Sequence, residues 1–186
     1  MESEKESETT VWNLDSAHSQ ADFAVRHMMI STVKGTFERV SGTIVGDPSD
    51  VENSRAEIRI DASSVSTRDK QRDGHLKSQD FFYVEKFPEL KFVSKKITRK
   101  GKEEIEVTGE LTIRDVTREV TLTGTLEGPL KDPYGFERFG VSAEGSIDRS
   151  QWGLKWNSVL ETGGVMVGDR VKISVNLEAV KKKDSL

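Results

Sequence analysis

The clearest structural signal in the chain lies in residues 104–127, which read EIEVTGELTIRDVTREVTLTGTLE. Apolar side chains occupy every second position in two runs, at Ile105, Val107, Leu111 and Ile113 and then at Val120, Leu122 and Leu126. Such alternation is typical of β-strands with one buried side and one side facing water. The short polar link at 114–116 predicts that the two strands are antiparallel neighbours.

The same alternation recurs along the chain and predicts an all-β protein. Strands are expected at residues 20–26, 33–46, 54–62, 88–99, 103–114, 117–128, 136–147 and 170–181. Within 33–46 the alternation shifts between Phe37 and Val40, which indicates a bulge near Glu38–Arg39. Short links such as 99–102 and 131–135 favour a meander, and eight antiparallel strands with one apolar face favour a closed barrel. A two-sheet sandwich is the alternative.

One charged segment interrupts the strands. Residues 67–82 read TRDKQRDGHLKSQDFF and predict a helix, with Thr67 as its N-cap, Asp69 in its first turn and Gly74 as a weak point. The helix falls between the third and fourth predicted strands. It is therefore expected to lie across one mouth of the barrel as a lid. A second, short helical turn is expected at His27–Thr32.

Composition and charge exclude several classes of protein. The chain has 186 residues, 28 basic and 32 acidic side chains, a net charge of −4 and no cysteine. Nothing in this balance attracts a nucleic acid, and without cysteine there are no disulfides or thiolate metal sites. Residues 1–10 are expected to be a flexible acidic tail, 11–181 a single barrel domain and 182–186 a flexible tail.

The chain shows no secretory leader pattern, so a cytoplasmic location is expected. Because an aromatic girdle is also missing, the apolar side of the strands is expected to point into the barrel rather than toward lipid. The Lys181–Lys183 run is typical of a solvated chain end. Transient contact of that run with an anionic membrane is the less favoured alternative.

The inside of the barrel is the first candidate site. Gly42, Gly109, Gly124 and Gly145 fall on the apolar phase of their strands and favour an open lumen, although glycines also mark strand bends. An open lumen would suit an elongated apolar guest. The predicted lining residues are Phe23, Val25, Phe37, Ile44, Ile58, Ile60, Phe92, Leu111, Ile113, Leu122, Phe139 and Val141.

The polar mouth is the second candidate site. Its predicted residues are Arg68, Asp69, Arg72, Asp73, His75 and Lys77, which would meet the head group of an amphiphilic ligand. The alternative is that these residues form an ordinary solvated face of a helix and bind no ligand. Trp12, Trp152 and Trp156 are expected to plug the barrel ends or to belong to the core.

The residues favour a protein without metal, cofactor or catalysis. His18, His27 and His75 lack the spacing of metal ligands, and no acidic cluster is evident beside them. His75 with Asp73 or Asp80 near Ser78 does not amount to a nucleophilic triad, because no nucleophile-elbow motif accompanies them. We therefore predict no metal site, no cofactor and no enzymatic activity.

Seven motifs together resemble one known family. They are Trp12–Ser19 (WNLDSAHS), Phe23–Met28 (FAVRHM), Arg72–Phe82 (RDGHLKSQDFF), Val84–Pro88 (VEKFP), Leu111–Arg118 (LTIRDVTR), Trp152–Asn157 (WGLKWN) and Val167–Asp169 (VGD). In this order they closely resemble the YceI family, with Tyr83 standing where an acidic residue is usual. The resemblance implies a lipocalin-like eight-stranded barrel with a helical cap, which binds polyisoprenoid or other long amphiphilic chains.

Function is therefore expected to be non-catalytic binding, transport or sequestration of an isoprenoid lipid. The resemblance implies a polyprenyl phosphate or an isoprenoid quinone as the partner, and a homodimer is a further expectation. One alternative is an enzyme that acts on such a lipid, with His75 or Asp73 transferring the proton. The other is a filled barrel whose surface binds a protein partner.

Overall fold

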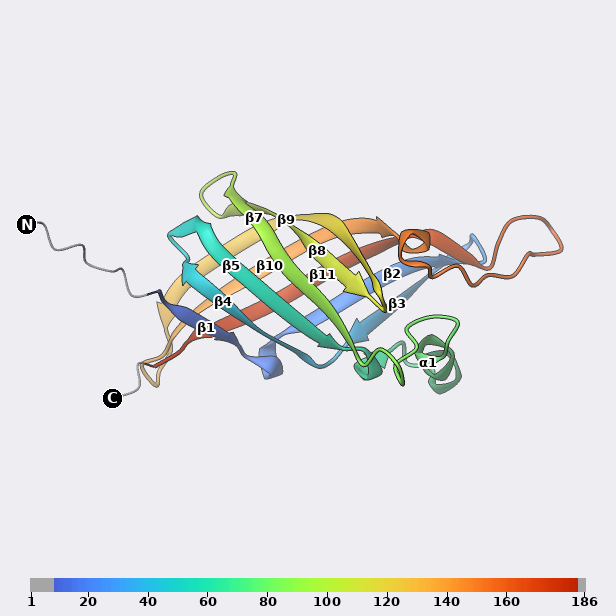
Figure 1. Cartoon of the computed structure of the whole chain (residues 1–186), viewed down its shortest axis with the longest axis horizontal. Coiled ribbons are helices and arrows are strands. Elements are labelled where there is room, and N and C mark those ends of the chain that lie inside the picture. Colours follow the sequence, from blue (N-terminus) through green and yellow to red (C-terminus); the bar gives the residue numbers. More distant parts are fainter. Residues whose placement is uncertain (1–8, 184–186) are drawn as a thin grey trace, which may run out of the picture.

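The computed structural model describes residues 9–183 and shows a sheet of eleven strands with one α-helix (Figure 1). The strands are β1 Val11–Leu14, β2 Gln20–His27, β3 Ser31–Phe37, β4 Val40–Asp47, β5 Asp50–Asp61, β6 Val65–Ser66, β7 Glu89–Arg99, β8 Glu104–Ile113, β9 Val116–Lys131, β10 Glu137–Asp148 and β11 Val167–Lys181. The helix α1 spans Lys70–Lys77, and 3₁₀ turns occupy Ser16–His18, Ala62–Ser64 and Arg149–Trp152. The predicted tails lie mostly outside the described residues.

The sheet closes into the predicted antiparallel barrel. Its order is β1-β4-β5-β7-β8-β9-β10-β11-β2-β3-β6, and β1 pairs with β11 as well as with β4. Counting β1 with β2, and β3 with β4, as two bent strands gives eight, with β6 as a short addition. The meander β7–β8–β9–β10 follows from its short links, and Val107 lies opposite Leu122 as the alternation requires.

Closure depends on a strand that the sequence pattern did not predict. In β1, Val11–Asn13 pair with Thr43–Val45 of β4, while Trp12–Leu14 pair with Ala179–Lys181 of β11. Four residues are too few to display a periodicity, and half of this strand is buried. The two long strands that it joins would otherwise leave unpaired edges at this end of the barrel.

The predicted strand 33–46 is divided into β3 and β4 at the expected irregularity near Glu38–Arg39, where the chain turns a corner instead of forming a bulge within one strand. The backbone N–H groups of these two residues donate to the carbonyl and the hydroxyl of Ser64 instead of to a neighbouring strand. As a result β3 pairs with β2 whereas β4 pairs with β5. The corner thus separates β3 from β4 on the side of the barrel where α1 lies.

The helix is shorter than predicted. Its N-cap is Asp69, whose carboxylate accepts from the Arg72 N–H, and it ends before Ser78, so 78–82 are turns. Thr67 is buried and not a cap, because its N–H and hydroxyl both donate to the Asp73 carboxylate at 2.8 and 2.6 Å. Gly74 lies inside the helix.

The predicted helical turn at His27–Thr32 is also wrong. The segment is a tight hairpin turn between β2 and β3, closed by a 3.2 Å hydrogen bond from the Ile30 N–H to the His27 carbonyl. Met28 and Met29 adopt φ values of 51° and 63°. Positive φ at both central residues is the pattern of a type I′ turn, which matches the twist of the paired strands.

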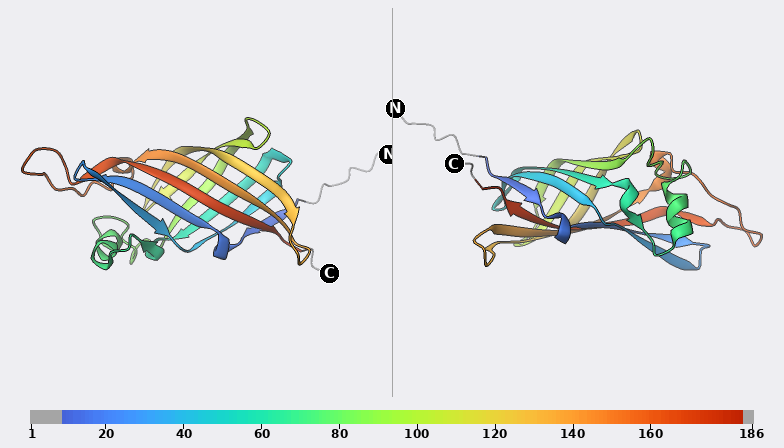
Figure 2. Two further views of the ribbon diagram at one scale, coloured as in Figure 1. Left: turned by 180° about the vertical axis from the view of Figure 1, so that it is seen from behind. Right: turned by 90° about the horizontal axis from the view of Figure 1, so that it is seen from below.

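The two ends of the barrel differ. Both described chain ends lie at one end, together with the β4–β5 and β9–β10 turns (Figure 1). The β2–β3 hairpin and the loop 153–166 extend past the barrel at the opposite end, where α1 also lies (Figure 2). No helix in the described part of the chain is long and apolar enough to cross a membrane.

An ionic cluster around Arg138 ties the first of these ends together. Its guanidinium bonds to Asp132 in the β9–β10 turn at 2.7 Å and to Asp15 after β1 at 2.9 Å, with Glu178 of β11 at 3.5 Å. Hydrogen bonds from His18 and Arg138 lower the pKa of Asp15, and the bond from Arg138 lowers that of Asp132. The cluster therefore links β1, β10 and β11 where the barrel closes.

We expect Arg138→Gln to lower the free energy of unfolding near pH 7. A carboxylate with a lowered pKa in the folded protein contributes stability above its unfolded pKa, and loses it as the pH falls through the folded pKa. The difference between variant and parent should accordingly shrink below about pH 4. Urea unfolding across pH would measure this. Arg59→Gln, in a more exposed pair with Glu57 and Glu89, should change stability less; equal losses at all pH values would contradict the prediction.

Candidate ligand-binding cavity

A long apolar cavity of about 840 Å³ runs through the barrel. This volume lies in the range of roughly 300–1,000 Å³ that is usual for small-molecule sites. Its lining extends from Trp12 and Pro48, near the chain ends, to His75 and Trp156, near α1. The walls are aliphatic and aromatic side chains of the inward phase of the strands, so the cavity suits a ligand that is apolar along its length.

The structure places all twelve predicted lumen residues in the lining of this cavity. They reach it from strands that are far apart in sequence: Phe23 from β2, Ile58 from β5, Leu111 from β8 and Phe139 from β10. The period of two explains the agreement, since a closed barrel gives every strand one inward face. Their contact with a ligand stays a prediction.

The glycines do not line the lumen in the predicted way. Gly42, Gly109, Gly124 and Gly145 are absent from the cavity lining, and a Cβ on any of them would collide with a neighbouring strand or side chain. At Gly109 the colliding ring is that of Phe92, and at Gly35 it is that of Phe23. These glycines let two aromatic rings lie against the barrel wall, which leaves the middle of the lumen open.

The polar mouth is only partly as predicted. Asp69, Arg72 and His75 line the cavity, whereas Arg68, Asp73 and Lys77 do not. The Asp73 carboxylate is held by Thr67, and Arg68 is exposed with a φ of 64°. The helix α1 begins only at Lys70 and has little more than two turns, so Arg68 and Asp69 lie before it.

Arg72 is held at the mouth by two hydrogen bonds to one residue. Its Nε and Nη2 atoms donate to the hydroxyl and the carbonyl of Thr67, both at 2.8 Å. These bonds fix the guanidinium against the barrel rim. Its Nη1 atom has no hydrogen bond within the described residues, so it is available to an acceptor on a ligand.

His75 belongs to an aromatic cluster at the mouth. Its ring packs edge-on against Phe81 and against Trp156, with centroid distances of 5.1 and 4.5 Å, and Nε2 lies 2.9 Å from the Asp80 carboxylate. The Ser78 hydroxyl donates to the His75 carbonyl rather than to the ring. The group thus shows no triad geometry, and it brings α1 into contact with the loop 153–166.

Other residues at the mouth were missed by the sequence analysis. Arg26, His27, Gln71 and Arg149 all contribute to the lining. Arg26 and His27 lie where β2 runs into its hairpin, so no alternation marks them as inward. The only available signal was their presence in or beside the quoted motifs.

Arg149 is a buried anchor for the loop between β10 and β11. Its guanidinium donates to the carbonyls of Leu154, Trp156, Val167 and Gly168 over 2.7–3.3 Å. Burial lowers its pKa. Because both ends of the loop bond to one fixed side chain, Trp156 is held at the mouth.

The tryptophans have separate places. Trp12 is buried at the chain-end side, donating to the Gly46 carbonyl at 3.0 Å and packing edge-on against Phe139. Trp152 is buried outside the cavity and donates to the Leu111 carbonyl at 2.9 Å. Trp156 lines the mouth. Trp12 therefore lines the lumen at the chain-end side and Trp156 lines it at the mouth.

The expectation that no acidic cluster accompanies a histidine is wrong for His18. Its Nδ1 atom lies 3.0 Å from Asp15 and 3.6 Å from Glu178, a grouping that only the β1–β11 pairing brings together. Arg138 bonds to the same two carboxylates. A resident cation thus already balances this cluster.

A closed antiparallel barrel around a ligand-sized apolar cavity defines the class of small-molecule-binding β-barrels. Within that class, residues 12–179 match the model of the YceI-like domain. The chain belongs to the YceI-like family.

Relatives and solved structures agree with this assignment. A UPF0312 protein of Staphylococcus aureus strain USA300 is 38% identical over 170 residues, which cover 91% of this chain and 96% of the relative. The crystal structure of BcnA from Burkholderia cenocepacia superposes with a TM-score of 0.77 at 25% identity, covering 89% of this chain and 98% of that one. The Campylobacter jejuni YCEI protein gives a TM-score of 0.73 at 32% identity, with 85% and 90% coverage.

A fourth match shows the fold alone. It is described as a polyisoprenoid-binding domain from Saccharophagus degradans, and it superposes with a TM-score of 0.71 at 15% identity, covering 92% of this chain and 98% of that chain.

We expect Gly35→Ala to narrow the lumen. A Cβ at this position would lie 2.2 Å from Phe23 Cζ, and the three nearest atoms all belong to that ring, so the ring has to swing inward. A crystal structure should show the displaced ring, and binding of an apolar fluorescent probe should weaken. Gly74→Ala is the control, because nothing lies within 4 Å of its Cβ position. An unmoved Phe23 ring in the Gly35 variant would refute the prediction.

Proposed function

We propose that this protein binds a long-chain isoprenoid lipid in its barrel and carries or sequesters it without changing it chemically. The observation that supports this most is the apolar cavity of about 840 Å³, which runs the length of the barrel. Burial of the chain would drive binding at roughly 25 cal/mol per Å² of apolar area, less the ordering of chain and protein. The polyisoprenoid-binding description of the Saccharophagus degradans domain, which has the same fold, is in keeping with such a ligand.

The head group of the ligand would lie at the mouth near α1. Arg72 offers Nη1 there, and Arg26 and His75 also line this end. A guanidinium recognises phosphate oxygens by charge and by paired hydrogen bonds, and a quinone carbonyl by hydrogen bonds alone. A polyprenyl phosphate or an isoprenoid quinone would satisfy both the lumen and the mouth.

Binding without catalysis agrees with the arrangement of the titratable groups at the mouth. Asp73 is bonded to Thr67, and the His75 ring is bonded to Asp80 and packed between Phe81 and Trp156. A general acid or base has to reach the proton that it moves. Both groups are instead occupied in holding the mouth together.

Native mass spectrometry of the purified protein, followed by denaturing extraction, tests the proposal directly. We expect one isoprenoid per chain and an unchanged ligand mass after incubation. Added polyprenyl phosphate should raise Tm, since a ligand at a hundred times its Kd stabilises by about 2.7 kcal/mol. An empty protein whose Tm does not respond would favour a barrel that binds a partner by its surface, and a changed ligand mass would favour an enzyme.

A blocked lumen separates cavity binding from surface binding. Val141 lines the cavity from β10, so Val141→Trp should fill part of the cavity. The variant should bind the ligand at least tenfold more weakly, and the ligand should raise its Tm less than that of the parent. Thr123→Trp on the exposed side of β9 is the matched control and should leave binding unchanged. Equal binding by both variants would contradict a site in the lumen.

A further inference from the structure

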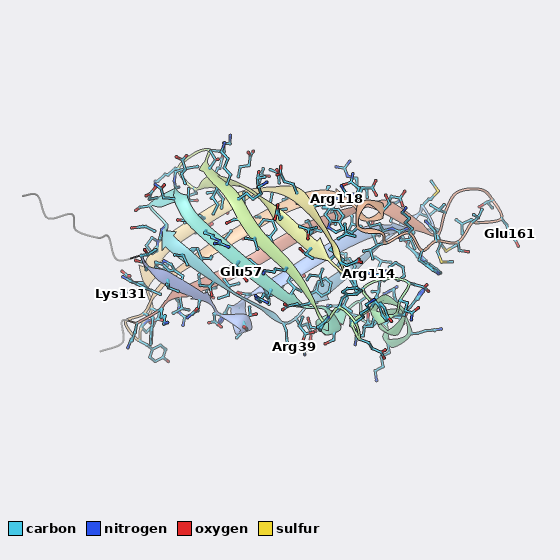
Figure 3. All side chains as sticks on the ribbon, in the orientation of Figure 1. Arg39, Glu57, Arg114, Arg118, Lys131 and Glu161 are labelled. Carbon is cyan, nitrogen blue, oxygen red and sulfur yellow. The ribbon has the colours of Figure 1, made fainter. Side chains whose placement is uncertain are left out.

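Five apolar side chains are exposed together at the mouth end of the barrel. They are Met28, Met29 and Ile30 of the β2–β3 turn and Val159 and Val165 of the loop 153–166, and we call them the apolar tip. Ile30 is 79% exposed and Val159 is 82% exposed. Figure 3 shows Glu161, which lies between the two valines in sequence, at the outer extreme of the molecule. The tip is therefore convex and projects beyond the barrel.

The two parts of the apolar tip form one ordered surface. The Met28 N–H donates to the Met166 carbonyl at 2.7 Å, and the Met166 N–H donates to the Ser158 carbonyl at 2.9 Å. The Met29 sulfur would lie 2.4 Å from a Cβ placed on Gly164, so its side chain rests directly on the loop. The hairpin and the loop thus continue the sheet outward from β11.

The turn at the apolar tip has methionines at two positions whose backbone conformation favours other residues. Both Met28 and Met29 have positive φ, a conformation for which Asn-Gly is the preferred pair. Residues other than glycine and asparagine are strained there by about 1–2 kcal/mol each. Side chains kept exposed at such a position gain no core packing in return, which points to a use outside the folded chain.

The apolar tip is fixed to the mouth of the cavity. Arg26 donates through Nη2 to the Met29 carbonyl at 3.0 Å and through Nη1 to the Thr32 hydroxyl at 3.3 Å. Arg26 and Met166 also line the cavity. A surface that contacts the apolar tip therefore lies beside the opening through which a ligand enters.

The charges around the apolar tip suit a lipid surface. Residues 24–34 contain Arg26 and Lys34 and no acidic residue, although the whole chain has a net charge of −4. In 153–170, Lys155 and Arg170 balance Glu161 and Asp169. In the β2–β3 turn, methionine and isoleucine with Arg26 and Lys34 behind them match the apolar interior and the anionic head groups of a membrane, and the loop adds two valines without net charge.

We propose that the apolar tip docks on the surface of a lipid bilayer and sets the mouth of the cavity against it. A second copy of the chain is the less suitable occupant, because a stable dimer buries about 800 Å² per partner and two convex loops offer no such flat face. Docking itself needs no ligand. That the mouth then takes a lipid from the bilayer rests on the function proposed above.

The double substitution Met28→Asn with Met29→Gly tests docking without weakening the fold, because it installs the preferred pair for this turn. In flotation assays with phosphatidylcholine vesicles containing phosphatidylglycerol, we expect the full chain to float. The partition coefficient of the variant onto the vesicles should be lower by about tenfold or more, since two apolar side chains no longer enter the bilayer. Its Tm should equal or exceed that of the parent.

Leu130→Asn with Tyr134→Asn is the matched control. These two side chains are 64% and 84% exposed at the opposite end, beside Lys131 in Figure 3. Their removal should leave flotation unchanged. The proposal would be overturned if the parent did not float. It would also be overturned if flotation were lost in this control, or after replacement of Lys182 and Lys183. Sedimentation showing a dimer that the Met28/Met29 variant dissociates and no vesicle binding would overturn it as well.

Ligand loading is scored separately, so that the two proposals fail in different ways. The Val141→Trp variant should float like the parent and yet carry no lipid. The Met28/Met29 variant should still bind polyprenyl phosphate added from detergent, but extract it from vesicles at least tenfold more slowly. If the parent floats and never loads, docking stands and the lipid-carrier function falls.

Discussion

The divided pairing of β11 is the constraint on which the rest of the structure depends. Its last residues pair with β1, which also pairs with β4, and this closes the barrel beside the chain ends. Its earlier residues pair with β2, which leads through β3 to the short β6. One strand therefore belongs to a closed ring at one end and to a splayed sheet at the other. Trp12 lines the cavity where β1 inserts, and residues of α1 and of the loop 153–166 line it at the other end.

The inner wall was predictable from the sequence because alternation and closure fix it together. Once the strands that carry Ile58, Leu111 and Phe139 form one ring, each inward residue has a single face to occupy. The rim was predictable only in part, because most of its residues lie where the alternation ends. The charged segment pointed to Arg72 and His75, whereas Arg149 is in a 3₁₀ turn and Arg26 lies where β2 runs into its hairpin, and β1 is too short to show a period. The His18 cluster needed Glu178, which is distant in sequence and arrives only through strand pairing.

The lumen is open for a reason different from the one that small residues suggest. Glycines on the inward phase were expected to create space by lacking side chains. They instead accept neighbouring groups: the ring of Phe92 occupies the position over Gly109, and that of Phe23 the position over Gly35. Each pair keeps a large apolar side chain flat on the wall, so the cavity gains an aromatic surface without losing its width. Buried aromatic area is what a long hydrocarbon contacts, and dispersion with such a wall grows with every added carbon atom.

The two ends of the barrel differ in how their charged side chains are paired. At the closed end, Arg138, Asp15, Asp132 and Glu178 satisfy one another, so the charges stabilise closure and leave little for a ligand. At the mouth, Thr67 and the loop carbonyls hold Arg72 and Arg149, and Nη1 of Arg72 has no hydrogen bond within the described residues. Under the proposed function, the apolar volume would set how strongly a chain binds, while the guanidinium of Arg72 would select its head. Affinity and selectivity would then come from separate parts of the barrel, and ligands that share a tail but differ in their heads would be told apart at the rim.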